Sequence, residues 1–153
     1  MILVRHAHAG SRSQWHHDDS LRPLSERGHE QAALLIKSLC DDQIDEVWTS
    51  STVRCRQTVA PLCAERGLTM DDHHLLAKGA RPDALLAWVL AHAAAPWLLC
   101  THGEVFEALL RTGRTSGLVD APARATEKGA AWRVSSLRDG SMKWDYLPPR
   151  PLL

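Results

Sequence analysis

The sequence of 153 residues is 44% hydrophobic and 24% charged, and its 18 basic side chains balance 18 acidic ones. This length and composition are typical of a globular domain that buries its own core, and we expect a single domain over residues 1–153. A balanced charge excludes a bulk electrostatic attraction to nucleic acid or to an anionic membrane. Any site for an anion must therefore be built locally.

The cysteines are too scattered for a typical zinc site or a small disulfide framework, because no two of them form a C-x-x-C pair. They are Cys40, Cys55, Cys63 and Cys100. We expect reduced thiols in a cytoplasmic protein. The chain begins with an apolar strand instead of the basic segment and apolar core of a signal peptide. The apolar stretch 84–99 is interrupted by His92 and Pro96 and is too short to span a bilayer.

Strands and helices alternate through most of the predicted elements. In chain order they are a strand 2–5, a helix that starts within 23–28 and runs to 39, a strand 46–49, a helix 53–66, a short strand 75–76, a helix from 82 to about 93, a strand 97–100 and a helix from 105 to about 111. Apolar residues at helical spacing predict the helices, and so do their ends: Ser25 as an N-cap, Gly67 as a C-cap and Pro82 in a first turn.

The last predicted element is a β-hairpin. Apolar runs at 130–134 and 142–146 flank Asp139-Gly140, which is a strong hairpin signal. The earlier alternation implies parallel strands joined by helical crossovers, with helices on both faces of the sheet. We therefore expect a three-layer α/β/α sandwich with a mainly parallel central sheet and a C-terminal antiparallel hairpin.

Three of the predicted strands are followed by polar segments that carry an arginine or a histidine. The first ends in Arg5 and His6, the second is followed by a Thr-Ser-Ser run with Arg54 behind it, and the fourth is followed by His102. Ligands bind beyond the carboxyl ends of strands in open α/β sheets, so these four side chains should converge on an oxyanion pocket. Taken singly, each is more often a salt-bridge partner or a structural donor, and spacing alone leaves both interpretations open.

The same residues resemble the motifs of a known family. Leu3-Val4-Arg5-His6-Ala7 resembles the Arg-His-Gly signature of the histidine phosphatase (phosphoglycerate mutase-like) superfamily, with Ala7 in place of the usual glycine. Three further segments resemble its helix start, its second arginine segment and its second histidine motif, in family order; they are 23–28, 50–58 and 100–103.

Within this superfamily, the short length and the segment 19–24 are most similar to the SixA-type phosphohistidine phosphatases. Related domains also occur fused to nucleotide-cleaving Nudix domains, so a nucleotide or another small phosphate ester stays open as substrate. The resemblance implies catalytic roles for His6 as nucleophile and for Arg5, Arg54 and His102 around the phosphoryl group. We expect a set of substrate-binding residues at the same site, which are Arg5, Arg54, His102, Gly103, His8 and Arg22.

The resemblance implies no cofactor and no metal, because the arginines supply the positive charge that metals supply elsewhere. Their charge should also depress the pKa of His6 and stabilise the in-line transition state. The adjacent histidines at 16–17 and 73–74 complete no metal site, since neighbours on a strand point apart. Gln57 and Thr58 are predicted to hold the loop of the arginine in place rather than to bind substrate.

The general acid is where the sequence departs from the family pattern. Many relatives carry a carboxylate shortly after the third strand, but the segment 75–80 has none. Glu104, Asp18 and Asp19 remain as candidates. A missing acid favours a P–N bond or another good leaving group, because imidazole, with a pKa of about 6.5, leaves more easily than an alkoxide.

The leading interpretation is thus a metal-independent phosphatase that forms a phosphohistidine on His6 and acts on phosphohistidine in a signalling protein. The alternatives are a small-molecule phosphatase for a nucleotide or sugar phosphate, and a non-catalytic phosphate-binding module. A mutase is disfavoured because the short chain has little material for a lid that excludes water. The expected partner is a phosphorylated protein or a small phosphate ester, with no nucleic acid and no membrane. The oligomeric state is not predicted.

Overall fold

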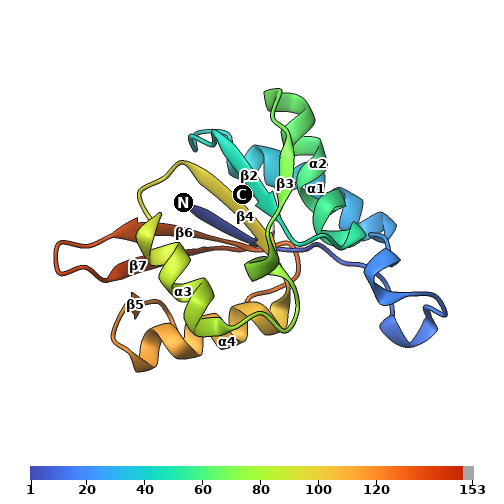
Figure 1. Ribbon diagram of the computed structural model, residues 1–153. Helices are drawn as coiled ribbons and strands as arrows, with labels where there is room; N and C mark the ends of the chain where they lie inside the picture. The colour runs from blue at the N-terminus through green and yellow to red at the C-terminus, as the bar shows by residue number, and fades with distance from the viewer. Residues whose placement is uncertain (150–153) are drawn as a thin grey trace.

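Seven strands form one mixed sheet in the order β3-β2-β4-β1-β6-β7-β5 (Figure 1). The strands are β1 (Ile2–Arg5), β2 (Glu46–Thr49), β3 (Met70–Asp72), β4 (Trp97–Thr101), β5 (Val119–Asp120), β6 (Ala131–Ser136) and β7 (Met142–Leu147). The computed structural model describes residues 1–149. The first four strands of this order run parallel, while β6 is antiparallel to both β1 and β7. The mainly parallel sheet with its C-terminal hairpin is thus confirmed.

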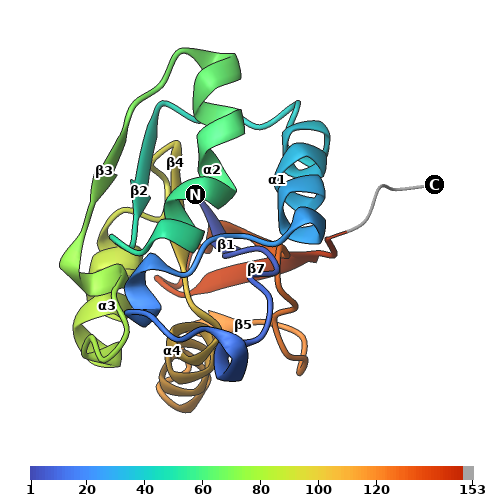
Figure 2. The ribbon, with the colours of Figure 1, turned by 90° about the vertical axis from the view of Figure 1, so that its right-hand side faces the viewer.

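Helices cover both faces of the sheet (Figure 2). They are α1 (Glu26–Ser38) and α2 (Val53–Arg66) on one face, and α3 (Pro82–Ala91) and α4 (Gly103–Thr115) on the other. Successive side chains of β1 point to opposite faces, so Leu3 packs in the core under α3 and α4, and Ile2 and Val4 pack in the core under α1 and α2. The predicted three-layer sandwich is confirmed. Within residues 1–149, no helix is long and apolar enough to cross a membrane.

The predicted helix ends hold in the structure. The Ser25 hydroxyl accepts a hydrogen bond of 3.1 Å from the backbone N–H of Gly28, which satisfies a free donor in the first turn of α1. Gly67 ends α2 with a φ of 65°, a left-handed conformation that favours glycine. Pro82 lies in the first turn of α3, where its missing N–H costs nothing.

The predicted strand at 75–76 is wrong. These residues belong to a 3-10 turn, η3 (His74–Leu76), and the third strand is β3, three residues earlier. β3 is an edge strand of mostly exposed Met-Asp-Asp, so it lacks the apolar pattern that sequence reasoning requires. Leu76 is instead fully buried in the core under α3 and α4, where it anchors the turn. The two-residue strand β5 was not predicted, and α4 extends beyond the predicted 105–111 at both ends.

Candidate active site

The candidate site lies where β1, β2 and β4 end. These strands are neighbours and run parallel, with Arg5 opposite Thr101 and Thr49 opposite Cys100. The next residue after β1 is His6, and the next after β4 is His102, so the two rings lie with their centroids 5.4 Å apart at an interplanar angle of 66°. His6 is 6% exposed and His102 is fully buried. The expected convergence of the two histidines is therefore present.

His6 is held in one tautomer. Its Nδ1 lies 2.8 Å from the backbone carbonyl of Ala7, and because a carbonyl only accepts, Nδ1 carries the proton. The lone pair is then on Nε2. Burial is the largest cause that lowers the pKa of His6, and the charges of His102, Arg54 and Arg5 also lower it, so that the pKa falls to about 3 against the opposing effect of the Ala7 hydrogen bond. The ring is thus neutral over the physiological range, as a nucleophile must be.

His102 faces the site with an unused nitrogen. Its Nε2 lies 2.9 Å from the hydroxyl of Ser50, and its Nδ1 is buried with no hydrogen-bond partner among the described residues. His102 is also the N-cap of α4, so the positive end of that helix dipole lies beside it. A Ser50 hydroxyl that donates to Nε2 leaves Nδ1–H as a free donor for an anion.

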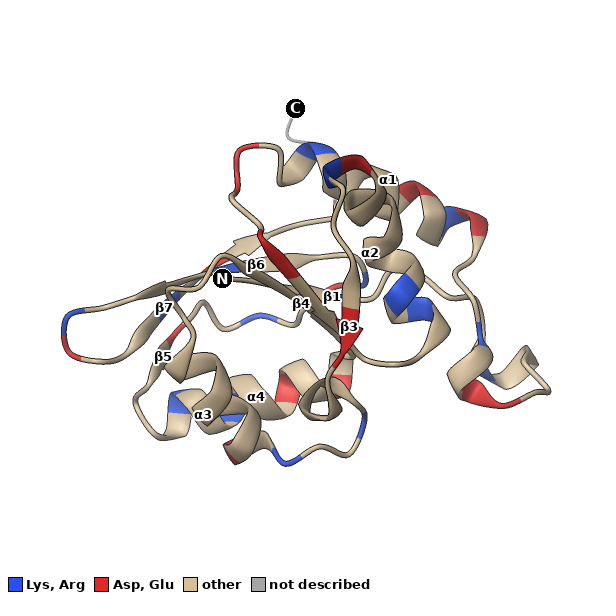
Figure 3. Ribbon diagram, turned by 45° about the horizontal axis from the view of Figure 1, so that its top comes forward, with Lys and Arg blue, Asp and Glu red and all other residues tan. Residues whose placement is uncertain are grey.

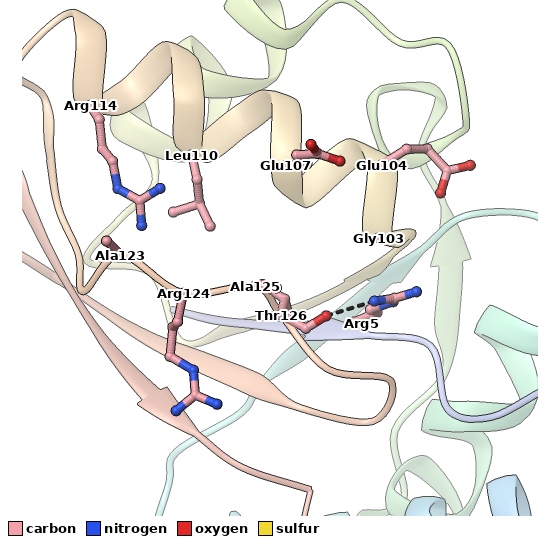
Figure 4. A pocket seen from close by; sticks show the side chains of 10 residues that line it. All are labelled: Arg5, Gly103, Glu104, Glu107, Leu110, Arg114, Ala123, Arg124, Ala125 and Thr126. Atoms are coloured by element: carbon pink, nitrogen blue, oxygen red, sulfur yellow. Dashed lines mark hydrogen bonds between the residues drawn. The ribbon is translucent and has the colours of Figure 1, made fainter.

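Arg5 packs against the start of α4. Its Nη1 donates a hydrogen bond of 2.7 Å to the backbone carbonyl of Thr126, while its Nε is buried without a partner in the described chain (Figure 4). A Cβ on Gly103 would lie 2.5 Å from the Arg5 Cζ, so only glycine allows this close approach. Gly103, predicted to bind substrate, thus makes room for the guanidinium.

Arg54 is fully buried at the start of α2. Its Nη1 donates to the backbone carbonyl of Asp19 at 2.7 Å and its Nη2 to the Asp19 carboxylate at 3.0 Å, whereas its Nε has no partner among residues 1–149. The site therefore contains three buried N–H groups without partners, on Arg5, Arg54 and His102. An unpaired buried donor costs about 1–3 kcal/mol, so three in one place indicate a site built for an anion.

The opening of the site is lined by ion pairs. Asp19 begins a 3-10 turn, η2 (Asp19–Leu21), and its carboxylate lies 3.1 Å from Arg22 Nε and 3.4 Å from Lys78 Nζ in addition to Arg54. Lys78 also lies 3.2 Å from Glu104 Oε1. Figure 3 shows the acidic start of η2 and the basic first turn of α2 on the same side of the molecule. We call Asp19, Lys78 and Glu104 the rim, and His6, His102 and Arg54 the floor.

The rim carboxylates are ionised. Partial burial by itself would raise the pKa of Asp19, but the hydrogen bond from Arg22 and the charges of Arg54 and Lys78 bring it well below the usual range. The pKa of Glu104 is also lowered, because its backbone and Lys78 hydrogen bonds outweigh the effect of burial. Asp18, the third candidate acid, is exposed and accepts hydrogen bonds from the N–H and hydroxyl of Ser20.

Two predicted substrate-binding residues lie beside the floor rather than in it. The His8 ring contacts the Ser25 hydroxyl at 2.6 Å and lines a separate cavity of about 610 Å³ with Arg27 and Lys128. Arg22 is buried and donates to Asp19 and, at 2.8 Å, to the carbonyl of Ala9.

Gln57 and Thr58 support other segments of the chain through their side chains. The side-chain oxygen of Gln57 accepts from the N–H of Leu24 at 2.8 Å, and the Thr58 hydroxyl accepts from the N–H of Ala7 at 2.9 Å. Sequence reasoning missed Ser50 as the partner of His102, although it stands inside a matched motif. It also missed Lys78, for which the sequence carries no signal.

A cavity of about 680 Å³ opens beside the site between α4 and the segment 123–126 (Figure 4). Arg5, Gly103 and Glu104 line the end nearest the site, and Arg114 and Arg124 line the far end. Nowhere in residues 1–149 do three or more His, Cys, Asp or Glu side chains gather in a way that could hold a metal ion.

Comparison with known proteins links this geometry to a family. The profile described as "Histidine phosphatase superfamily (branch 1)" matches residues 1–78, which include His6 and Arg54. The chain is also 34% identical over 155 residues to a curated protein of Mycolicibacterium smegmatis named 8-oxo-(d)GTP phosphatase. That match covers 97% of this chain and 48% of the relative, so the chain spans about half the length of that protein.

Solved structures share the fold. A protein from Agrobacterium tumefaciens that carries the name SixA superposes with a TM-score of 0.75 at 23% identity, and each chain is 97% covered. The protein histidine phosphatase SixA complexed with tungstate gives a TM-score of 0.72 at 18% identity, again with 97% of each chain covered.

Proposed function

The chain belongs to the histidine phosphatase superfamily, and on that premise we propose that it removes a phosphoryl group from its substrate through a covalent phosphohistidine on His6. The three unpartnered N–H groups on Arg5, Arg54 and His102 are the observation that carries this proposal. The residues that carry them are electrostatic neighbours of a neutral imidazole whose Nε2 is free to attack. A tetrahedral phosphoryl group is the anion that such a ring of donors would accept.

The proposed reaction has two steps. His6 Nε2 attacks phosphorus, a P–N bond forms and the leaving group departs on the opposite side. Arg5, Arg54 and His102 stabilise the charge on the equatorial oxygens. Water then attacks the phosphohistidine and releases phosphate, which restores His6. Because fixed cations already surround the transferred group, we propose that no metal ion is required.

Two substrate classes have support. The superposed structures named SixA favour phosphohistidine on a protein, as the sequence predicted. The M. smegmatis relative, named for action on 8-oxo-(d)GTP, favours a nucleotide. Both classes have leaving groups that are good enough to depart without a protonated carboxyl group. This agrees with the ionised state of both rim carboxylates.

Trapping the intermediate tests the proposal. The protein is mixed with ³²P-labelled acetyl phosphate, quenched in alkali and digested, and we expect acid-labile label on the peptide that contains His6. His6→Ala should lose both label and turnover, while His29→Ala, which changes an exposed histidine of α1, should keep both. A chelator should leave turnover unchanged. An unlabelled wild-type protein that still binds phosphate would instead be a phosphate-binding module.

A further inference from the structure

The floor and the rim together fix where a leaving group must go. His6 and Arg54 are 6% and 0% exposed, whereas the side chains of Asp19, Lys78 and Glu104 are 33%, 31% and 55% exposed. In-line displacement places the leaving group opposite the attacking nitrogen. Because that nitrogen belongs to the closed end of the site, the leaving group faces the open end, which the rim lines.

Lys78 is the cation at this open end, and it is held firmly. The carbonyl of Leu76 accepts a hydrogen bond of 2.6 Å from the Thr101 hydroxyl at the end of β4, which ties the loop to the residue before His102. A turn follows, closed by the Ala80 N–H on the Ala77 carbonyl at 3.2 Å, with Gly79 at a φ of 78°. Lys78 stands in this turn, and its Nζ spans Asp19 on one side and Glu104 on the other.

The charges at the rim discriminate between kinds of leaving group. Neither Asp19 nor Glu104 is available as a neutral acid, because both are ionised and both bind Lys78. The remaining proton-bearing group is an ammonium ion. An ammonium ion stabilises a leaving group that departs as an anion. It opposes the departure of an imidazole, since the ring of phosphohistidine must first gain a proton and its positive charge.

We propose that Lys78 binds the anionic leaving group and that the substrates are phosphoanhydrides, in which a bridging oxygen joins the transferred phosphoryl group to a second phosphate. This inference rests on the proposed function and selects between its two substrate classes. In the first step the bond from phosphorus to the bridging oxygen breaks as the bond to His6 Nε2 forms. The bridging oxygen keeps the electron pair and leaves on a terminal phosphate beside Lys78. In the second step water attacks phosphorus, and the bond from phosphorus to His6 Nε2 breaks with its electron pair returning to that nitrogen. The released phosphate keeps the oxygen and the protons of the water.

The test compares two phosphoryl donors in the full chain. ADP and inorganic pyrophosphate have an anionic leaving group, and phosphoramidate has a P–N bond like that of phosphohistidine. Lys78→Met keeps the length of the side chain and removes the charge. It should lower kcat/KM for ADP and pyrophosphate by about 10- to 100-fold and should not lower kcat/KM for phosphoramidate. Lys78→Arg should retain most of the anhydride activity.

Two further variants separate an effect on the leaving group from an unspecific change of charge. Lys78→Met with Glu104→Gln restores the net charge of the rim, and we expect the anhydride activity to stay low. Full recovery in this double variant would contradict the proposal, because the loss would then come from an unpaired Glu104. Lys143→Met removes an exposed lysine of β7, and it should change neither donor.

The outcomes also distinguish this inference from the proposed function. Label on His6 from phosphoramidate but not from the anhydrides, with no effect of Lys78→Met, would overturn the inference and leave the phosphatase standing. The absence of label from every donor would overturn the phosphatase itself.

Discussion

The floor and the rim of the site are built on opposite physical principles. The floor residues are buried and follow strand ends or open a helix, and two of them, His102 and Arg54, leave a nitrogen without a partner among the described residues. The rim residues are a third to a half exposed, lie in turns or in the first turn of a helix, and neutralise one another as ion pairs. Positions on strands and helices are more rigid than positions on loops. The floor can therefore hold any phosphoryl group with accuracy, and the rim decides what is attached to it.

The contrast is sharpest for two arginines of α2. Arg54 is fully buried, whereas Arg56 is 45% exposed and pairs with Asp72 at 2.7 Å. We expect Arg54→Met to lower kcat/KM by about 10³-fold, because it removes a fixed donor to the transferred oxygens. Arg56→Met should change kcat/KM by less than about twofold, as an exposed ion pair contributes little. Steady-state kinetics on one phosphoryl donor measures kcat/KM of both variants. Comparable losses in the two variants would show that the buried arginine is no more important for activity than the exposed one.

The burial of a neutral His6 should make the free energy of unfolding depend on pH. The pKa of His6 falls from 6.5 to about 3 on folding, so below pH 6.5 the unfolded chain binds a proton that the folded chain refuses. The contribution of this group is fully present above pH 6.5 and is lost as the pH falls toward 3. Between pH 6.5 and about pH 4.5, wild type should lose about 2 kcal/mol more unfolding free energy than His6→Gln, because the unfolded histidine goes from half to almost fully protonated over this range.

Urea titrations at the two pH values give this difference, and His29→Gln serves as the control. His29 is exposed on α1, so its replacement should leave the pH dependence equal to that of wild type. Parallel losses in wild type and His6→Gln would mean that the imidazole is not held neutral by the fold.

The difference between the floor and the rim also explains which site residues could be predicted from the sequence. His6, Arg54 and His102 were found because each follows a strand or opens a helix, and parallel strands bring their carboxyl ends together. Their catalytic roles stay predictions. Lys78 lies in a turn without periodicity, and its partner Asp19 is 59 residues away in the chain. No local pattern encodes such a contact. The strand β3 was missed for a related reason, since its polar edge residues bury no face.

Two glycines test how the residues around the site are supported. An added Cβ at Gly103 would meet the mobile end of Arg5, at 2.5 Å from Cζ, whereas at Gly28 it would meet the backbone carbonyl oxygen of His8 at 2.0 Å. Gly103→Ala should therefore keep the fold and displace Arg5, with a loss of roughly 10- to 100-fold in kcat/KM. Gly28→Ala should mainly lower the melting temperature, because the backbone cannot move aside. Thermal melts and kinetics measure both effects. A lower melting temperature in Gly103→Ala together with an activity loss alone in Gly28→Ala would contradict this account.

Asp19 connects the two regions, and its effect should be the smallest. Its carboxylate holds Arg54 of the floor and Lys78 of the rim, so Asp19→Asn loosens the arginine and also removes a negative charge that repels the substrate. We expect kcat to fall by about tenfold from the misplaced guanidinium, and KM for an anionic substrate to fall as well. Asp18→Asn changes an exposed neighbour whose side chain accepts hydrogen bonds from Ser20, and both constants should stay near wild type. A carboxylate that served as the proton donor would show another pattern: kcat would fall without a lower KM, and the loss would grow with the basicity of the leaving group. The split between kcat and KM therefore decides whether Asp19 positions the floor or takes part in the chemistry.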